Sequence, residues 1–402
     1  MKKLMILGAG IYQVPLIKKA KEMGLQTLVV SVPGEYPGFQ YADRVFLLDT
    51  RDCEGIYQAA RKEQIDGICT SGTDVAVVTI GYVCEKMGLP GIPREAARIV
   101  TDKALMKEAF QKKQVRAARY HKVFSAKEAE EAAQEIGFPV IVKRVDSSGS
   151  RGILKVSKRE DVESAFREAV SGSRVPYVLV EEVLGGREIG VDGFVQDGKL
   201  VFLAPHEKFV YQGEKITVPM GHGFPLQEDA KTLEEISRQM QLAVEAAGMD
   251  QCPVNADVFV RDQKAWIVEI GGRTGATCIP ELIGIHYGCD FYEKKIRIAL
   301  GEPVSFEERE HTPCMAKLLV SPRGGKITDI DHEGIRKIRE EGVEVQLDYP
   351  VGHSVSAMEN GTDRIGHVIA RTKREEELDE VIQRVEKCIE IDHRTLEELW
   401  GK

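Results

Sequence analysis

Several features that mark common protein classes are missing from this chain of 402 residues. No stretch approaches 18 consecutive apolar residues, so the sequence predicts no membrane span. The first residues lead into a glycine turn without the apolar run and small-residue cleavage site of a signal peptide. The net charge is −9 and no run of Lys and Arg is interleaved with aromatics, which argues against a nucleic-acid partner. These absences predict a soluble, cytoplasmic protein.

The eight cysteines also lack any metal-binding or disulfide pattern. They are scattered, with no Cys-x-x-Cys pair and no histidine at the spacing of zinc ligands. We therefore expect reduced thiols, as in cytoplasmic proteins.

The first motif, LMILGAGIYQVPLI, has the pattern of a strand, a glycine turn and a helix. A dinucleotide-binding fingerprint needs a third glycine and an acid at the end of the second strand. Here those positions hold Gln13 and Ser31, so a nicotinamide oxidoreductase is a disfavoured alternative. We interpret Gly8 and Gly10 as a strand-to-helix turn at the carboxyl edge of a sheet, where Gly10 is a candidate for the wall of a substrate pocket.

The order of predicted elements indicates an α/β protein of several domains, because the chain is long for one core. Residues 1–94 alternate strand and helix, which predicts a Rossmann-like parallel sheet with helices on both faces. The next segment begins with one predicted helix over 94–113 and continues with strands and helices. Strands beyond residue 178 come in hairpins, and residues 315–330 predict another hairpin on a Gly324-Gly325 turn.

A phosphate-binding pattern occurs in PVIVKRVDSSGSRGILKV, residues 139–156. Lys143 ends an apolar strand and supplies a positive charge, while the small residues of 147–152 let backbone N–H groups approach phosphate oxygens. The stretch is not a P-loop, because no G-x-x-x-x-G-K-[ST] precedes a helix. Taken alone, an ordinary hairpin turn with a solvated lysine remains the alternative.

Two carboxylates stand twelve residues apart in NADVFVRDQKAWIVEIGGRTG, residues 255–275. A short turn at 261–263 can pair the two strands and bring Asp257 and Glu269 together on one face. Paired carboxylates suit Mg²⁺, and Arg273 in the following Gly-rich loop can reach a transferring phosphoryl group. A solvated hairpin with two acids is the alternative, but Glu269 follows an apolar run where an unligated carboxylate is costly.

With these motifs the sequence resembles an ATP-grasp enzyme over nearly its whole length. The resemblance implies a pre-ATP-grasp domain at 1–94, a lid subdomain with the phosphate loop at 95–177, a second α+β subdomain with the magnesium site at 178–304, and a small α+β domain at 305–402. ATP is expected between the two grasp subdomains.

The resemblance also implies nucleotide contacts, taken residue by residue. Lys103, after Asp102, matches the lysine of the family's Asp-Lys pair, and Lys143 matches the second lysine, which is also a candidate catalytic residue. The family's phosphate loop is matched by Ser147, Ser148, Gly149 and Ser150. The strand that hydrogen-bonds adenine is matched by Glu181, Glu182 and Val183, and the acid on the ribose hydroxyls by Glu188.

Asp257 and Glu269 match the family's carboxylates for Mg²⁺, which Mn²⁺ can replace. Arg273 matches the catalytic arginine of the family's E-x-N-P-R motif. The chain departs from that motif because Gly271 and Gly272 replace the asparagine and the proline. We therefore expect one firmly held Mg²⁺, or a second completed by water. A noncatalytic ATP-binding protein remains an alternative because of this replacement.

The segment HEKFVYQGEKITVPMGHGFP is similar to the substrate-side loop of carbamoyl-phosphate synthetase halves. It offers His206, Glu207, Lys208, Tyr211 and His222 as candidates for the acceptor pocket. For each of them an ordinary polar residue on a long loop is an equal alternative.

The resemblance implies an ATP-dependent ligase that joins a small-molecule carboxylate to an amine through an acyl phosphate and releases ADP. The segment EIGGRTGA and the C-terminal domain look most like the amino-acid ligases, and a homodimer is expected. A bicarbonate-activating carboxylase or carbamoyl-phosphate-synthetase-like enzyme is the main alternative.

Overall fold

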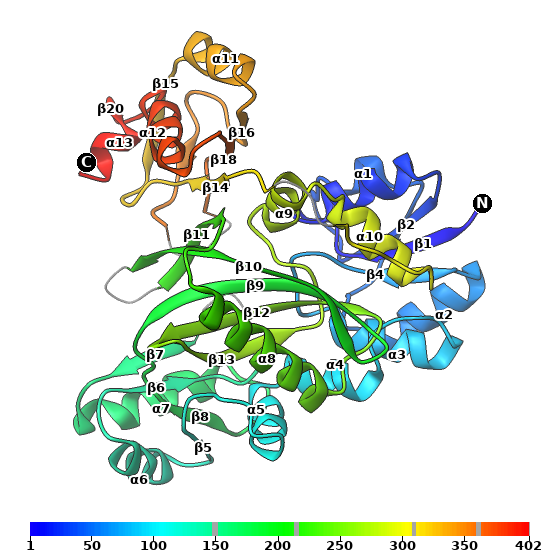
Figure 1. The fold of residues 1–402 in the computed structure, drawn as a ribbon, viewed down its shortest axis with the longest axis vertical. Helices are drawn as coiled ribbons and strands as arrows, with labels where there is room; N and C mark the ends of the chain where they lie inside the picture. Colours follow the sequence, from blue (N-terminus) through cyan, green and yellow to red (C-terminus); the bar gives the residue numbers. More distant parts are fainter. Residues whose placement is uncertain (147–151, 213–216, 308–310, 359–362, 402) are drawn as a thin grey trace. The chain divides into compact units, whose positions relative to one another are not determined.

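The structure, a computed structural model, describes residues 1–146, 152–212, 217–307, 311–358 and 363–401. It divides the chain into two compact units, each an α/β arrangement as predicted (Figure 1). Unit 1 comprises Met1–Pro205, Glu228–Ala276 and Phe291–Glu307, and unit 2 comprises His206–Gln227, Thr277–Asp290 and Glu308–Lys402.

Unit 1 begins with a parallel sheet of order β3-β2-β1-β4, built from β1 (Lys3–Leu7), β2 (Gln26–Ser31), β3 (Arg44–Leu47) and β4 (Gly67–Cys69). Its helices are α1 (Val14–Glu22), α2 (Cys53–Glu63), α3 (Val77–Met87) and the distant α10 (Phe291–Ala299), with a short 3₁₀ turn η1 (Phe39–Tyr41). Ile296 of α10 packs into the same core as Leu4 and Ile6. The apolar run of β1 is fully buried, as parallel strands covered on both faces require.

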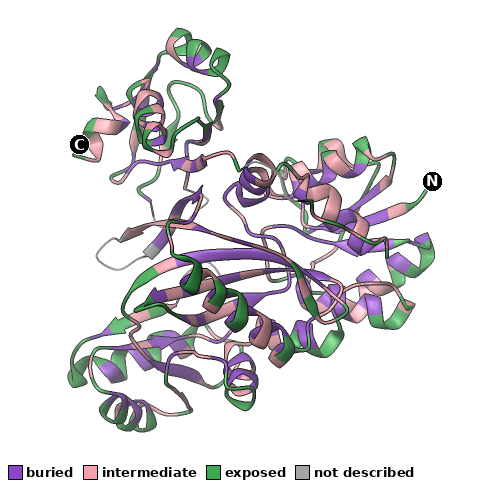
Figure 2. Cartoon of the chain, viewed as in Figure 1, coloured by how far each residue is buried: buried purple, intermediate pink, exposed green. Residues whose placement is uncertain are grey.

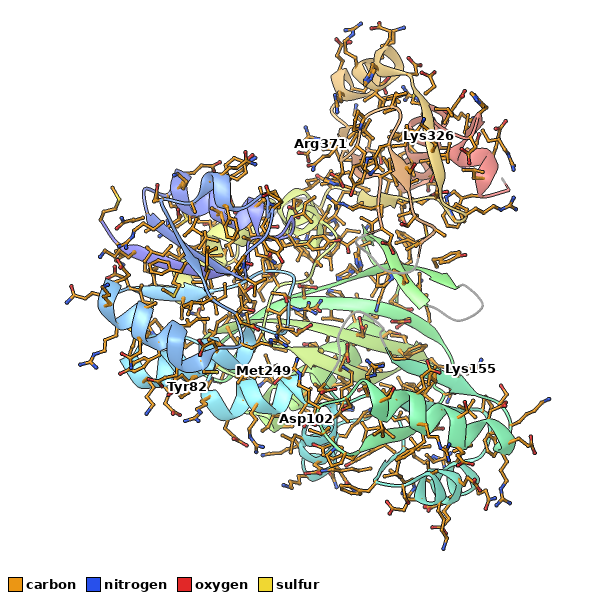
Figure 3. The ribbon with its side chains drawn as sticks, turned by 180° about the vertical axis from the view of Figure 1, so that it is seen from behind. Tyr82, Asp102, Lys155, Met249, Lys326 and Arg371 are labelled. Atoms are coloured by element: carbon orange, nitrogen blue, oxygen red, sulfur yellow. The ribbon has the colours of Figure 1, made fainter. Side chains whose placement is uncertain are left out.

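The single helix expected over 94–113 is wrong, because the structure has two helices there, α4 (Arg94–Thr101) and α5 (Lys103–Lys112). Asp102, labelled in Figure 3, stands between them with an extended backbone. Its carboxylate accepts hydrogen bonds from the amides of Ala104 and Leu105, so it begins a new helix. This break places Lys103 at the first position of α5.

A four-stranded antiparallel sheet follows, in the order β5-β8-β6-β7. It contains β5 (Tyr120–Val123), β6 (Val140–Lys143), β7 (Ile153–Val156) and β8 (Val178–Glu182), with α6 (Ala126–Ile136), η2 (Arg159–Asp161) and α7 (Val162–Ser171). Val142 and Val180 pack with the helices on one face, while Leu179 packs on Ala104 of α5. Because strand side chains alternate, Lys143 and Glu181 lie on the face toward α5.

The last sheet of unit 1 runs β13-β12-β9-β10 and is buried along most of its strands (Figure 2). It is formed by β9 (Arg187–Gln196), the first part of β10 (Lys199–Gln212), β12 (Cys252–Arg261) and β13 (Lys264–Gly271). Helix α8 (Ala230–Ala247) contacts β13, begins at the cap Asp229 and ends at Gly248 in the left-handed conformation.

Unit 2 contains the sheet β10-β11-β14-β18-β16, begun by the end of β10, and the sheet β17-β15-β19-β20. The further strands are β11 (Thr217–Phe224), β14 (Cys314–Leu319), β15 (Gly325–Ile330), β16 (Glu344–Leu347), β17 (Ser354–Val355), β18 (Gly366–Arg371), β19 (Ile389–Ile391) and β20 (Arg394–Thr395). Its helices are α9 (Ile279–Tyr287), α11 (His332–Glu340), η3 (Glu375–Glu377), α12 (Leu378–Lys387) and α13 (Leu396–Leu399).

The hairpin expected over 315–330 is wrong, since β14 and β15 belong to different sheets. Both edges of β14 are taken by β11 and β18, whereas β15 pairs with β17 and β19. Gly324 and Gly325 have φ of 70° and 126°, and they turn the chain out of the first sheet instead of folding it back. No helix in the described part of the chain is long and apolar enough to span a bilayer.

Candidate active site

Two acidic residues lie opposite each other on the β12–β13 hairpin. Asp257 and Glu269 are direct cross-strand partners, as the sequence predicts. The next pair on the same face is Asn255 and Gly271. This end of the hairpin therefore holds two carboxylates and one carboxamide.

The Lys103 ammonium pairs with one of these carboxylates. Its Nζ lies 3.0 Å from Oε2 of Glu269, and its backbone N–H donates to the carbonyl of Val145, which follows β6. Burial alone would lower the pKa of Lys103, but the Glu269 carboxylate outweighs burial and the pKa lies above its ordinary value. A predicted phosphate-binding lysine and a predicted metal ligand thus neutralise each other.

Lys143 forms a second ion pair, with Glu181 on the neighbouring strand. Their Nζ and Oε2 atoms are 2.8 Å apart, and both side chains are buried. A third residue, Lys107 of α5, lies 3.7 Å from the same oxygen. Burial tends to raise the pKa of Glu181, but the two lysines outweigh burial and the pKa lies below its ordinary value. Sequence reasoning missed Lys107, although a lysine one turn after Lys103 on a buried helix face was a signal.

The remaining candidates for ATP binding lie on different elements of the fold. Glu182 is partly exposed and pairs with Nε of Arg119 at 3.1 Å. Val183 follows β8, and Glu188 lies on β9 opposite Phe259. The phosphate-loop candidates Ser147, Ser148, Gly149 and Ser150 lie outside the described residues.

Arg273 is held by Asp74, a residue of the loop between β4 and α3. Arginine Nε and Nη2 donate to the two carboxylate oxygens at 2.8 and 2.9 Å, and Nη1 donates to Oδ1 of Asn255. Burial would lower the pKa of Arg273, but the Asp74 carboxylate more than compensates and the pKa is raised. Sequence reasoning did not find Asp74, because nothing local connects it with an arginine 199 positions away.

A network of buried polar groups holds the loop that follows Arg273. Asp192 of β9 accepts from Nδ2 of Asn255 at 2.8 Å and from the amide of Gly275 at 2.7 Å. The Thr274 hydroxyl is 2.8 Å from the Ser71 hydroxyl and accepts from Nζ of Lys295 at 3.1 Å.

Lys295 is buried on α10, and burial lowers its pKa to about 8. It was also missed, because its sequence neighbours form an ordinary amphipathic helix. Through Thr274 it ties α10 to the loop that carries Arg273.

The side chain of Gln13 closes the N-terminal glycine turn. The Gly10 amide donates to Oε1 of Gln13 at 2.9 Å, and Nε2 of Gln13 donates to the Ser71 carbonyl. Gly8 has φ of 100°, which favours glycine. The Gly10 amide therefore already has a hydrogen-bond partner. If Gly10 lines a substrate pocket, it would do so through its Cα and not through its amide.

The acceptor candidates of 206–222 belong to unit 2. The buried His206 and His222 rings meet edge to face with centroids 4.8 Å apart, and Lys208 is the strand partner of His222. Glu207 accepts from the amide of Gln227, and Tyr211 packs on Trp400. Burial lowers the pKa of His222 well below its ordinary value, so this residue is a neutral core histidine.

The oxygen donors on the β12–β13 hairpin suit Mg²⁺, which prefers carboxylate and amide oxygens and keeps several waters. Across the described ranges, no three His, Cys, Asp or Glu residues form a group that could hold a metal ion. The carboxylates of Glu269 and Asp74 are engaged by Lys103 and Arg273. The oxygen donors are of the type that Mg²⁺ prefers, and a bound Mg²⁺ would compete with Lys103 and Arg273 for these carboxylates.

Comparison with known proteins defines the class. Residues 136–281 match the family model of the ATP-grasp domain. The chain therefore contains an ATP-grasp domain, whose family uses ATP with Mg²⁺, and the resemblance inferred from its motifs is confirmed. Its C-terminal segment, residues 317–394, matches the family model of the L-amino acid ligase C-terminal domain 2.

The relatives span several ligase activities. The chain is 24% identical over 326 residues to the formate-dependent phosphoribosylglycinamide formyltransferase of Methanocaldococcus jannaschii, covering 75% of this chain and 77% of the relative. Phosphoribosylglycinamide synthetase from Anaerococcus prevotii superposes with a TM-score of 0.81 and 29% identity over 97% of this chain and 99% of its own. L-amino acid ligase from Bacillus licheniformis, at 18% identity over 98% and 99%, shares the fold with a TM-score of 0.82.

Proposed function

We propose that the protein is an ATP-dependent carboxylate–amine ligase that forms an amide between amino-acid substrates and releases ADP and phosphate. The observation that carries the proposal is a set of exchangeable ion pairs: Lys103 with Glu269, Lys143 with Glu181, and Arg273 with Asp74. Each pair joins a cation that can bind phosphate to a carboxylate, and a buried charge needs such a partner.

Binding of a nucleotide with its metal would exchange these partners. Lys103 and Lys143 would turn to the phosphates, while Asp257 and Glu269 would hold Mg²⁺. The bound metal neutralises phosphate charge, as phosphoryl transfer generally requires. The ion pairs keep the side chains in place beforehand, which reduces the reorganisation needed when the substrates arrive.

The reaction then has two steps. A carboxylate oxygen of the acid attacks the γ-phosphorus of ATP, and the bond between that phosphorus and ADP breaks. The amine nitrogen attacks the acyl carbon, phosphate leaves with its electron pair, and the amine loses a proton to solvent. Arg273 stabilises negative charge on the acyl phosphate, and the lysines position the nucleotide.

Amino-acid substrates are favoured by the L-amino acid ligase C-terminal domain at residues 317–394. A second candidate is the transfer of formate to phosphoribosylglycinamide, which is favoured by the formyltransferase relative.

The test is phosphate release with ATP and Mg²⁺ against single and paired amino acids. Separate arms contain bicarbonate alone, and formate with phosphoribosylglycinamide. We expect release that needs two amino acids, with ADP as the nucleotide product. Activity only with formate and phosphoribosylglycinamide would favour the second candidate, bicarbonate alone would favour the carboxylase reading, and AMP as product would refute the mechanism.

Two variants test the site assignment. Glu269→Gln and Lys143→Ala should each lower phosphate release by about a hundredfold or more, because they remove a metal ligand and a phosphate contact. The matched control is Lys155→Ala, since Lys155 lies exposed on β7 in the same sheet as Lys143 and is labelled in Figure 3. Undiminished activity after either of the first two changes would refute the assignment.

A further inference from the structure

A lysine and a glutamate of the candidate active site each have one buried atom without a hydrogen bond. Nζ of Lys107 and Oε1 of Glu181 are buried and have no hydrogen-bond partner within the described residues. The side chains are 2% and 5% exposed. Nζ of Lys107 lies 3.7 Å from Oε2 of Glu181, and Nζ of Lys143 lies 2.8 Å from that same oxygen. A buried donor and a buried acceptor that are both unmet and so close indicate a second arrangement in which they meet.

Two neighbouring strands and one helix of unit 1 bring these three side chains together. On the β6–β8 ladder Glu181 pairs with Ile141, so Lys143 stands two residues further along the same face. Helix α5 covers this face, because Ala104 packs with Leu179 of β8. Glu181 therefore lies between a lysine of its own sheet and a lysine of the covering helix.

We propose that Lys107 is a positioning residue that becomes the partner of Glu181 when a nucleotide draws Lys143 away. The inference rests on the proposed function, in which Lys143 turns to the phosphates of ATP. Without another cation, that movement would leave the Glu181 carboxylate buried and unpaired, which is costly. The Lys107 ammonium can replace Lys143 with little movement, because 3.7 Å is just beyond the hydrogen-bond limit of about 3.2 Å.

The charges of the three groups favour this exchange of partners. The two lysines outweigh burial and hold the pKa of Glu181 below its ordinary value. Burial lowers the pKa of Lys107 to about 8, and the charge of Lys143 adds to that shift while Glu181 opposes it. When Lys143 leaves, a repelling charge is removed and Lys107 is alone with the carboxylate. Glu181 therefore stays ionised in both arrangements, on the strand that the resemblance assigns to adenine.

The test compares ATP with adenosine, which has no phosphate to draw Lys143 away. Binding to the full chain is measured without substrates, by calorimetry for ATP and by ligand-detected NMR for the weaker adenosine. In Lys107→Met the Kd of ATP should rise about tenfold, whereas the Kd of adenosine should change by less than about twofold. A residue that only supports the fold, or one that contacts the base, would weaken both ligands alike, and that result would overturn the proposal.

A second background separates action through Glu181 from direct contact with phosphate. In Glu181→Gln the carboxylate charge is absent, so no buried anion needs a new partner. Adding Lys107→Met to Glu181→Gln should then change the Kd of ATP by less than about twofold. A further tenfold loss in this background would show that Lys107 itself binds phosphate, and would overturn the proposal.

The matched control is Lys112→Met, because Lys112 lies exposed near the end of the same helix. It should bind both ligands as the wild type does. Thermal melts check that each variant is folded. If Lys107→Met does not fold, Lys107→Gln, which also lacks the charge, replaces it in both comparisons with the same expected results.

The outcomes are distinct from those that test the ligase activity, because nucleotide affinities are measured without an acid or an amine. If Lys107→Met weakens ATP alone while no amino-acid pair gives phosphate release, the ligase is refuted and the role of Lys107 stands. If release needs two amino acids while Lys107→Met weakens ATP and adenosine alike, the ligase stands and the role of Lys107 is refuted.

Discussion

The buried polar groups of the two units differ in part. In unit 1 they are charged and paired, with Lys103, Lys143 and Arg273 each opposite a carboxylate. In unit 2 several are histidines, and burial lowers the pKa of His222, His286 and His367, the last to about 4. The first kind can exchange partners with an ionic ligand, whereas the second kind is neutral and packs with aromatic rings. Unit 2 also holds ion pairs, among them Lys317 with Glu386 and Arg364 with Asp348, but the candidate ATP and metal ligands lie in unit 1.

The largest expected effect comes from removing a cation of unit 1. Lys143→Ala should lower kcat/KM for ATP by about a hundredfold or more, roughly 2.7 kcal/mol of transition-state stabilisation. Glu181 keeps Lys107 as a partner, so the thermal unfolding temperature should change little. Kinetics and thermal melts of Lys143→Ala and of the control Lys155→Ala make the measurement. A large loss of stability with normal ATP kinetics would show that Lys143 is structural and would contradict its assignment to nucleotide binding.

In unit 2 the expected effect is on stability and depends on pH. The folded pKa values of His222, His286 and His367 lie below the unfolded value of about 6.5, so the unfolded chain binds more protons. Stability is therefore fully present above pH 6.5 and is lost as pH falls toward the folded values. From His367 alone, whose folded pKa is about 4, the loss by pH 4.5 should be about 2.5 kcal/mol.

The two tryptophans allow this measurement on the full chain, because Trp266 lies in unit 1 and Trp400 in unit 2. In Trp266→Phe, the fluorescence of Trp400, which packs on Tyr211, reports unit 2. Denaturant unfolding at pH 7.5, 6.0 and 4.5 should show the decline. His367→Asn should make it shallower, and a profile flat down to pH 4.5 would contradict the neutral-histidine description.

A smaller effect is expected from Lys107, whose Nζ makes no hydrogen bond within the described residues. Burial lowers its pKa to about 8, and Glu181 opposes that shift. Lys107→Met should weaken ATP binding about tenfold, roughly 1.4 kcal/mol, because Lys143 must then neutralise Glu181 alone. Titration calorimetry with Lys107→Arg as the conservative control checks it. Equal affinity in Lys107→Met and wild type would show that Lys143 suffices.

The smallest effect is expected at the start of α5. Asp102→Ala removes the cap and should cost about 1 kcal/mol of stability, with a severalfold weaker ATP affinity because Lys103 is the next residue. Asp102→Asn keeps an N-cap oxygen and should retain most of both. Denaturant melts and nucleotide titration compare the two. Equal losses in Asn and Ala would show that the charge, not the cap, is what matters.

Much of the fold could be predicted because its signals are local. The alternation of strand and helix over 1–94 and the pairing of Asp257 with Glu269 depend on periodicity and a short turn. The break at Asp102 was missed because its apolar neighbours keep the helical period on both sides. The expected 315–330 hairpin failed because sheet membership depends on which distant strands compete for each edge.

The candidate site was only partly predictable for a similar reason. Lys103, Lys143 and Glu269 stand in recognisable motifs, but their ion pairs join residues far apart in the chain. Asp74 and Asn255 join the site only through three-dimensional contacts with Arg273. A sequence pattern records which side chains a motif contains, not which other segment contacts them.

The glycine turn at the N-terminus has a consequence for the specificity of the protein. Gln13 gives the Gly10 amide the acceptor that an anion would otherwise provide, so the chain carries an internal ligand for its own turn. An anionic group on a substrate would have to displace that amide oxygen and also sever the bond from Gln13 to Ser71. One side chain at the third position of a glycine motif thus occupies the amide that a phosphate would otherwise need.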